Sequence, residues 1–452
     1  MKRLFSLALV GILGAMMVQL SAMSSVAASG TLTATDTSEI ATSYGHLTTD
    51  FYKKVDPQNV LDGVHTALQA QLKKAGIKKT LPPLLAGPTG NANLHAIDHQ
   101  IDAAAKLGGA KIGAHALTYG AIDGMMKSVH DRWTVFLTPK EYAALNQGLD
   151  GSDFGGTGIV IQTDSKTKYI AVSNVVPDAP ADKAGVQQDD LITAINGVST
   201  KGMSLNTASA HLRGKAGTTV SITIERDGKM LAPITLTRAK IHQLSVYPKM
   251  LPGKIGYVAV TVFGKDTGAE LTTALDRLQQ EGARAIIMDL RDNGGGYLDA
   301  AVAVSSKFIP SGPIVSVESR ASSITTLEAD ATAIPPMPLA VLVNQYTASA
   351  SEITSGAIQD SDVGTIIGTK TFGKGVVQTI FPLPDRSAVK ITTARYLTPH
   401  NRNINHLGIT PDIVLPENKG ARFGDPAKDA QLRRAMQFVD GQLAKLSAAN
   451  GE

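Results

Sequence analysis

Residues 284–296 read RAIIMDLRDNGGG, a short apolar run that ends in a polar, glycine-rich loop. Such a run predicts a strand that is buried on both faces, as in a parallel sheet. We expect a glycine-led helix after it, over residues 295–308. The same order recurs at residues 339–343, which read LAVLV and precede an expected helix over residues 348–359. Strands that alternate with helices in this way predict an α/β core with a mostly parallel central sheet.

The pattern changes on the N-terminal side of this core. Residues 29–150 have apolar residues mainly at helical spacing. Residues 151–240 instead contain short β-type runs, separated by turns such as Asn196-Gly197. With 452 residues, the chain is long enough for two or three domains. We therefore expect a mixed α/β protein with a helical region, a β module and an α/β core over residues 241–452, which ends in a helix.

The first residues indicate where the protein works. Lys2 and Arg3 precede a largely apolar run over residues 4–20, and small residues follow at positions 25–28. This layout is typical of a secretory signal peptide, which we place at residues 1–28. The alternative is an uncleaved membrane anchor, since a run of this length can span a bilayer. Either interpretation predicts a protein of the periplasm or cell envelope, secreted or held at the membrane by its leader.

Composition excludes several classes of function. The chain has no cysteine, which excludes disulfides, thiolate metal sites and cysteine nucleophiles. Its 43 basic and 39 acidic residues are interspersed, so we expect no nucleic-acid partner. His95 and His99 have the spacing of a metal-binding pair on one helix face, but no third ligand or HExxH motif accompanies them. We interpret them as part of a solvated helix face and predict no metal and no cofactor.

Two loops are candidates for the chemistry, because ligands of open α/β sheets gather at the carboxyl ends of strands. The loop at residues 289–296 contains three consecutive glycines, which allow the backbone to approach a ligand. The loop at residues 344–352 places Ser349 and Ser351 at the start of a helix. Either serine is a helix N-cap, with Glu352 as a favourable first-turn charge, or a nucleophile beside amides that stabilise negative charge.

A serine nucleophile needs a base, and neither serine lies in a GxSxG motif. Lys374 is a candidate, since it follows the apolar strand expected at residues 365–368 and lies between two glycines. A lysine acts as a base when burial lowers its pKa toward neutrality. The alternative is an ordinary loop lysine.

These segments together resemble the carboxy-terminal processing proteases, the PDZ-containing serine peptidases of family S41. The resemblance rests on residues 341–353, which include TASASEI, and on residues 371–378, which read TFGKGVVQ. It implies a ClpP/crotonase-like core with no metal in its active site. It also implies a role for five residues: the nucleophile Ser349, the base Lys374, the orienting residue Gln378, and the oxyanion-hole amides of Gly295 and Ala350.

Residues 151–240 resemble the PDZ domain of that family. The resemblance implies that an extended substrate tail adds to a sheet edge and that backbone amides bind its terminal carboxylate. The implied carboxylate loop and following strand begin with Gly155, Gly156, Thr157, Gly158 and Ile159. A plain glycine hairpin is the alternative.

The sequence departs from the family pattern at four places, one of which is Arg386, where the family usually has glycine. Gly294 stands where the family usually has proline, residues 129–133 read VHDRW instead of a Leu-Asp-Pro-His-Ser type segment, and residues 75–110 resemble an insertion in the helical region.

The sequence therefore predicts an exported serine endopeptidase that cleaves proteins near their C-termini with a Ser–Lys dyad. Its expected partners are proteins with exposed C-terminal tails and further copies of itself, with a dimer favoured. Two alternatives stay open: a catalytically weak peptide-binding protein on the same fold, and an adaptor in which the PDZ module is the working part.

Overall fold

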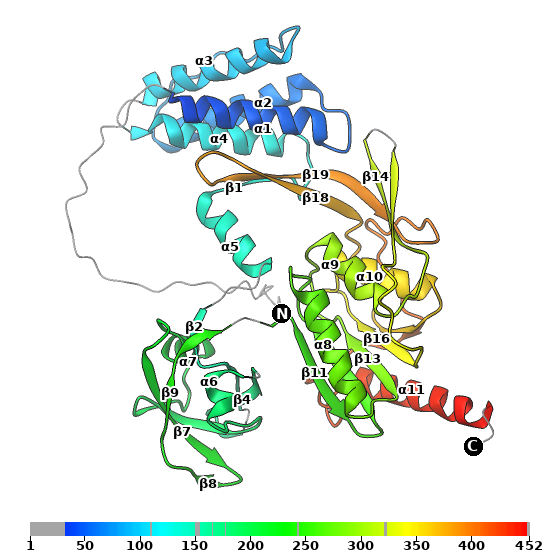
Figure 1. The fold of residues 1–452 in the computed structure, drawn as a ribbon. Coiled ribbons are helices and arrows are strands. Elements are labelled where there is room, and N and C mark those ends of the chain that lie inside the picture. Colours follow the sequence, from blue (N-terminus) through cyan, green and yellow to red (C-terminus); the bar gives the residue numbers. More distant parts are fainter. Residues whose placement is uncertain are drawn as a thin grey trace.

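The computed structural model describes residues 32–108, 111–149, 154–164, 166–176, 178–241, 244–320 and 323–449. The signal peptide predicted at residues 1–28 lies outside these ranges. A helical region, a β module and an α/β core follow one another along the chain (Figure 1). Within the described residues, no helix combines the length and the apolar character that a membrane crossing needs.

The N-terminal region is a bundle of four helices followed by a short strand and a fifth helix. Thr33 and Asp36 form a capping box at the start of the first helix, and Asp56 caps the second, whose first residue is Pro57. The elements are α1 (Ala34–Asp50), α2 (Pro57–Lys74), α3 (Gly90–Gly108), α4 (Ala114–Lys127), β1 (Val135–Leu137) and α5 (Pro139–Leu149).

Helices α2 and α4 cross in close contact because a glycine faces a glycine. A Cβ atom on Gly124 would lie 2.4 Å from the carbonyl oxygen of Gly63, and a Cβ atom on Gly63 would lie 2.4 Å from that of Gly124. Leucine, isoleucine and valine side chains from α1 to α4 pack around this crossing in one buried cluster.

The β module is an antiparallel sheet with two short helices. Strand β3 (Ile159–Thr163) forms one edge, and the order continues through β4 (Ile170–Val175), β5 (Leu191–Ile195), β7 (Thr219–Arg226) and β8 (Lys229–Met230). Strand β6 (Val198–Ser199) pairs with β5, and β9 (Ile234–Thr237) pairs with β7. The remaining elements are β2 (Phe154–Gly156), its partner β10 (Ala239–Ile241), α6 (Pro180–Lys183) and α7 (Leu205–Leu212).

The core is built on a six-stranded sheet in the order β11-β12-β13-β16-β17-β20, and its register confirms the predicted mostly parallel sheet. All five residues of β13 and all five of β16 are buried, as their continuous apolar runs require. The strands are β11 (Val246–Leu251), β12 (Ile255–Val260), β13 (Ala285–Asp289), β16 (Leu339–Val343), β17 (Thr365–Gly368) and β20 (Ile413–Val414).

Helices cover both faces of this sheet. Ile286 and Met288 of β13 belong to the apolar cluster that includes α8 (Thr267–Gln280), α9 (Leu298–Ser306) and α10 (Ala350–Asp360). Ile287, between them in sequence, belongs to the cluster on the other face, which includes α11 (Ala430–Ala449). The alternation of side chains along each strand thus produces a three-layered core, and the predicted C-terminal helix is one of its layers.

A second, antiparallel sheet connects the core to the helical bundle, which lies over it (Figure 1). It contains β14 (Pro313–Ser319), β15 (Ile324–Glu328), β18 (Val376–Pro382), β19 (Ala388–Leu397) and, from the N-terminal region, β1. Leu383, Val389 and Ile391 of the β18–β19 hairpin belong to the same apolar cluster as the helices. The hairpin is therefore held between the bundle and the core.

The glycine contact between α2 and α4 leads to a stability prediction. Replacing Gly124 with alanine favours the helix intrinsically by up to about 1 kcal/mol, but the new methyl group overlaps the backbone of α2. We expect Gly124→Ala to lower the free energy of unfolding by about 1–3 kcal/mol. Urea unfolding followed by the fluorescence of Trp133, the single tryptophan, measures this change. In the control Gly45→Ala, on α1, the added atom meets nothing within 4 Å, and stability should stay the same or rise.

Candidate active site

The two loops predicted to carry chemistry meet at the carboxyl ends of β13 and β16. The carbonyl oxygen of Asn293 accepts hydrogen bonds from the Ala348 N–H and from the Ser351 hydroxyl, both at 3.0 Å. The Oδ1 of Asn344 accepts one from the Asp292 N–H at 3.0 Å. Ser351 is fully buried, and its hydroxyl is used in the contact with Asn293. Ser349, the other serine at the start of the helix, is partly open to solvent.

A buried ion network holds the first loop from behind. The Arg291 guanidinium contacts the carboxylates of Asp289 and Asp429 at 2.5 and 2.7 Å, and it lies 3.8 Å from the centre of the Phe423 ring. All the guanidinium nitrogens are used in hydrogen bonds within this network, which joins the loop to the segment before α11. Arg291 thus anchors the loop and does not face a substrate.

The backbone at Ser349 is strained. Its φ of 57° and ψ of −117° lie in a region that side-chain-bearing residues rarely adopt, at a cost of about 1–3 kcal/mol. The turn is packed against Gly295, whose own φ is 97°. A Cβ atom added there would lie 2.8 Å from the Cβ of Ser349 and 2.8 Å from the amide nitrogen of Ala350. Only glycine allows the two loops to approach so closely.

One buried carboxylate ties the Ser349 turn to the Lys374 loop. The Oε2 of Glu352 accepts hydrogen bonds from the N–H of Ser349 at 2.9 Å and from that of Lys374 at 2.8 Å. Its Oε1 accepts from the Gly373 N–H at 2.7 Å and the Thr371 hydroxyl at 2.5 Å. Burial raises the pKa of Glu352, whereas these four donors lower it. The backbones of Ser349 and Lys374 are therefore held beside each other by a single side chain.

A tyrosine bridges the same two residues. The hydroxyl of Tyr396, on β19, lies 3.2 Å from the carbonyl oxygen of Ser349 and also donates to that of Lys374. Tyr396 is 1% exposed, and its burial raises its pKa well above the ordinary range. It therefore stays a neutral donor at neutral pH.

The Lys374 side chain lies in surroundings that favour its neutral form. Burial is the main cause, and the positive charge of Lys390 adds to it; together they lower the pKa of Lys374 to about 8. The carboxylates of Glu352 and Asp131 act in the opposite direction. Its Nζ lies 4.6 Å from the centre of the Trp133 ring, so the segment that departs from the family pattern covers the lysine.

Two of the other predicted site residues, Gly295 and Ala350, lie next to Ser349. Ala350 is the first residue of α10, a position whose N–H has no acceptor within the helix. The Gly295 N–H instead donates to the Oδ1 of Asn293 at 2.9 Å. Gln378, on β18, donates from its Nε2 to the carbonyl oxygen of Val376 at 3.3 Å. His95 and His99 are both exposed on α3, far along the chain from these residues.

The predicted carboxylate loop borders a groove in the β module. Thr157, Gly158 and Ile159 line a cavity of ≈ 220 Å³ together with residues of β3, α7 and the segment that leads to β11. Gly158 has a φ of 80°, and a Cβ atom there would lie 2.2 Å from that of Ala179. Gly155 and Gly156 lie on β2, which pairs with β10, and they do not line this cavity. The groove has the edge strand and the glycine turn that binding of an extended peptide requires.

Comparison with known proteins identifies the family. The model of peptidase family S41 matches residues 254–415, and a PDZ domain model matches residues 171–226. The carboxyl-terminal-processing protease of Picosynechococcus sp. is 34% identical over 339 residues, which cover 74% of this chain and 82% of that protein. The enzyme of the same name from Synechocystis sp. is 36% identical over 334 residues, which cover 72% and 78%.

The chain belongs to the carboxyl-terminal-processing proteases. The solved structure of a photosystem II D1 C-terminal processing protease aligns with a TM-score of 0.46 at 30% identity, and covers 85% of this chain and 94% of that one. Membership confirms the predicted serine-type peptidase, with a PDZ domain and an S41 core in a mixed α/β fold.

Three residues of this carboxyl-terminal-processing protease have roles that the sequence did not reveal. Glu352 is the first-turn charge that the sequence predicts, and it also holds both loops, which the sequence does not indicate. Tyr396 and Trp133 come from β19 and from the segment before β1, and nothing local in the sequence assigns them to this site. Their signal is tertiary: each lies near Lys374 only after the second sheet has formed.

The position of Glu352 gives a prediction for the enzyme. In Glu352→Gln, one carboxylate oxygen becomes an NH2 group, which cannot accept the hydrogen bonds that backbone N–H groups now donate to Glu352. We expect the free energy of unfolding to fall by about 2–4 kcal/mol and the turnover of a peptide substrate to fall about 100-fold. Activity is measured at a temperature at which circular dichroism shows the variant folded. The control Glu281→Gln removes an exposed ion pair with Arg277 and should change the free energy of unfolding by less than about 0.5 kcal/mol. Equal effects from both variants would contradict the role of Glu352 in holding the two loops together.

Proposed function

We propose that this protein is an exported serine endopeptidase that cleaves protein substrates near their C-termini with Ser349 as nucleophile and Lys374 as general base. One observation carries the proposal: Glu352 and Tyr396 each contact the backbones of both Ser349 and Lys374. These contacts hold a half-buried lysine, whose pKa is lowered, beside a strained serine turn. Perturbed pKa values and strained backbones are both concentrated at catalytic sites.

In the proposed first half-reaction, the Ser349 Oγ attacks the carbonyl carbon of the scissile peptide bond. Neutral Lys374 takes the hydroxyl proton as the C–O bond forms. The C–N bond then breaks, and Lys374 gives that proton to the leaving amine, which departs with the C-terminal fragment. The remaining substrate is an ester of Ser349. Water attacks the ester, Lys374 takes its proton, and the proton returns to the Ser349 Oγ as the carboxylate product leaves.

The oxyanion of each tetrahedral intermediate needs two donors. We assign this role to the N–H groups of Ala350 and Gly295, each worth about 2.7–4 kcal/mol in comparable sites. Ala350 stands at the N-terminus of α10, whose partial positive charge favours an anion. The Gly295 N–H must exchange its acceptor, the Asn293 Oδ1, for the oxyanion. Gln378 would orient the Lys374 amine through its carboxamide oxygen, since its nitrogen already donates to Val376.

The PDZ domain would select substrates by their tails. We propose that the chain end of a substrate adds to β3, with its carboxylate at the turn of residues 157–159. The apolar side chains of Ile159, Ile161 and Leu212 line the same groove and favour an apolar last residue. Export rests on the basic and apolar leader at residues 1–28. A dimer and attachment to the membrane through the leader stay predictions from the sequence.

The base assignment predicts the pH dependence of catalysis. Lys374 must be neutral to accept a proton, and its pKa is about 8, so the turnover number should rise with pH through about 8 and level off above it. Lys374→Arg and Ser349→Ala should each reduce turnover to background, since a guanidinium stays protonated. Lys370→Arg is the matched control on the exposed side of the same loop and should keep full activity. Turnover by Lys374→Arg near the wild-type rate would refute the dyad.

The tail-binding role predicts a difference between two peptides of one sequence. With Ser349→Ala, which prevents cleavage, fluorescence anisotropy should show that amidation of the peptide's C-terminus raises Kd at least about tenfold, because the carboxylate's bonds to backbone amides are lost. Equal Kd values would contradict the PDZ assignment and leave the dyad untouched. Peptide binding by an otherwise inactive wild type would instead favour the peptide-binding alternative.

A further inference from the structure

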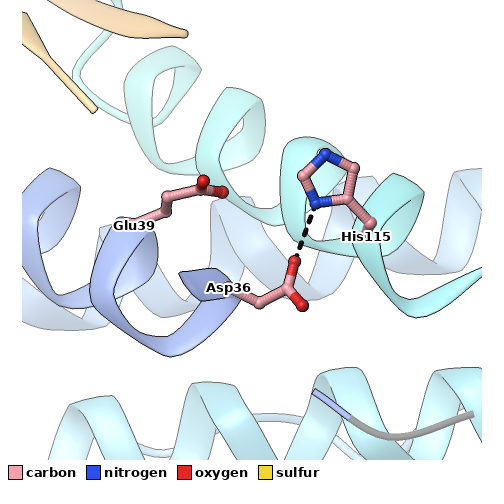
Figure 2. A group of neighbouring side chains, drawn as sticks. All are labelled: Asp36, Glu39 and His115. Carbon is pink, nitrogen blue, oxygen red and sulfur yellow. Dashed lines mark hydrogen bonds and ion pairs between the residues drawn. The ribbon is translucent and has the colours of Figure 1, made fainter. Parts of the chain in front are cut away.

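A second group of titratable side chains lies in the helical region, away from the residues assigned to catalysis. Asp36 and Glu39 lie one turn apart on α1, and His115 lies on the first turn of α4. Figure 2 shows the three side chains turned toward one another, with the Nδ1 of His115 2.8 Å from the Oδ1 of Asp36. Asp385, in the turn between β18 and β19, completes the group: its Oδ2 lies 3.9 Å from the Nε2 of His115.

Glu39 is the residue that needs an explanation. It is 0% exposed, and among the described residues neither of its carboxylate oxygens has a hydrogen-bond partner. A buried carboxylate without a partner is strongly destabilising. Its neighbours supply no fixed positive charge, because Asp36 and Asp385 are acidic and His115 is charged only when it is protonated. In the described part of the chain, no lysine or arginine forms an ion pair with these three carboxylates.

The group has the geometry of a cation site. One ligand atom each from Asp36, Glu39 and His115 lies within 4.8 Å of the other two. Ligand atoms around a tetrahedral zinc ion, with bonds of about 2.0 Å, are about 3.3 Å apart. Small side-chain rotations would therefore bring all three into contact with one ion. The His115 side chain is 53% exposed, which gives an ion a path from solvent to two buried carboxylates.

We propose that Asp36, Glu39 and His115 bind one divalent transition-metal ion of the Zn²⁺ class, with Asp385 as a third carboxylate beside it. Two carboxylates and an imidazole suit Zn²⁺ better than Ca²⁺, which takes six to eight oxygen ligands, or Mg²⁺, which keeps most of its water. The sequence predicts no metal, because His95 and His99 have the spacing of a metal-binding pair but no third ligand accompanies them. Here the ligands come from one helical turn and from a histidine 79 residues beyond it.

The ion would be structural. Its ligands join α1 to α4, and Asp385 belongs to the hairpin that the bundle covers. The hydroxyl of Tyr119, also on α4, donates a hydrogen bond to Asp385 and extends the same connection. The ion would therefore tie the helical bundle to the hairpin tip and replace an uncompensated negative charge with a coordinated one.

Metal binding is tested directly on the exported chain after treatment with a chelator. Titration of Zn²⁺ against a chromophoric competitor should show one saturable site per chain. Saturating Zn²⁺ should raise the melting temperature by about 5 °C, because it binds only the folded state. Both measurements use Ser349→Ala, so that proteolysis plays no part and the result is independent of the proposed dyad.

Glu39→Gln distinguishes a metal site from an unrelated buried acid. The variant should bind Zn²⁺ at least tenfold more weakly and lose the metal-dependent rise in melting temperature. Without metal it should melt higher than the parent, because an amide replaces a buried charge and can donate to Asp36 or Asp385. His115→Ala should also lose the zinc effect. The double variant His95→Ala/His99→Ala, which removes an exposed pair on α3, should retain it.

Three outcomes would overturn the proposal. They are the absence of a saturable site in the parent, equal zinc affinity in the parent and in Glu39→Gln, and loss of binding in the His95/His99 variant alone. A Glu39→Gln variant that is more stable, together with a parent that does not respond to Zn²⁺, would show that Glu39 is a protonated acid and that no cation belongs there.

Discussion

The candidate active site depends on one buried carboxylate. One carboxylate oxygen of Glu352 accepts hydrogen bonds from the N–H groups of both Ser349 and Lys374. These bonds hold together two loops that are 25 residues apart in sequence. The same charge favours the protonated form of Lys374, which opposes its use as a base. Burial and the charge of Lys390 outweigh that effect, since the pKa of Lys374 is still lowered to about 8. The group that positions the lysine thus limits how far its pKa falls, and a pKa near the working pH suits general base catalysis.

The sequence predicted the central sheet well and the second sheet poorly, for one physical reason. Strands β13 and β16 are buried on both faces, and continuous runs of four and five apolar residues, respectively, identify them in the sequence. Strand β19 is ten residues long and alternates less regularly, and its partners β1 and β14 come from distant parts of the chain. Pairing over more than 250 residues leaves no local pattern. The N-terminal region was therefore predicted as helical, without the strand that it adds to the core.

The same distinction between local and long-range features applies to the candidate site. Ser349, Lys374 and the glycine loop lie in short motifs, and the structure places them together at the carboxyl ends of adjacent strands. What the motifs could not predict is the environment that gives these groups their properties. The Trp133 ring over Lys374, the charge of Lys390 on β19 and the hydroxyl of Tyr396 all reach the site through the second sheet. The motifs thus predict the groups of the proposed dyad, whereas the electrostatic surroundings of these groups depend on the tertiary structure.

The hairpin of β18 and β19 connects the helical region to the candidate active site. Its open end lies at the active site: β18 begins two residues after Lys374, and Tyr396 lies near the end of β19. Its closed end carries Asp385 to the helical bundle, where Leu383 and Val389 are buried among the helices. A ladder of backbone hydrogen bonds joins the two ends. Any interaction that holds the closed end, the proposed cation included, would thus limit the motion of the strands that carry the Lys374 loop.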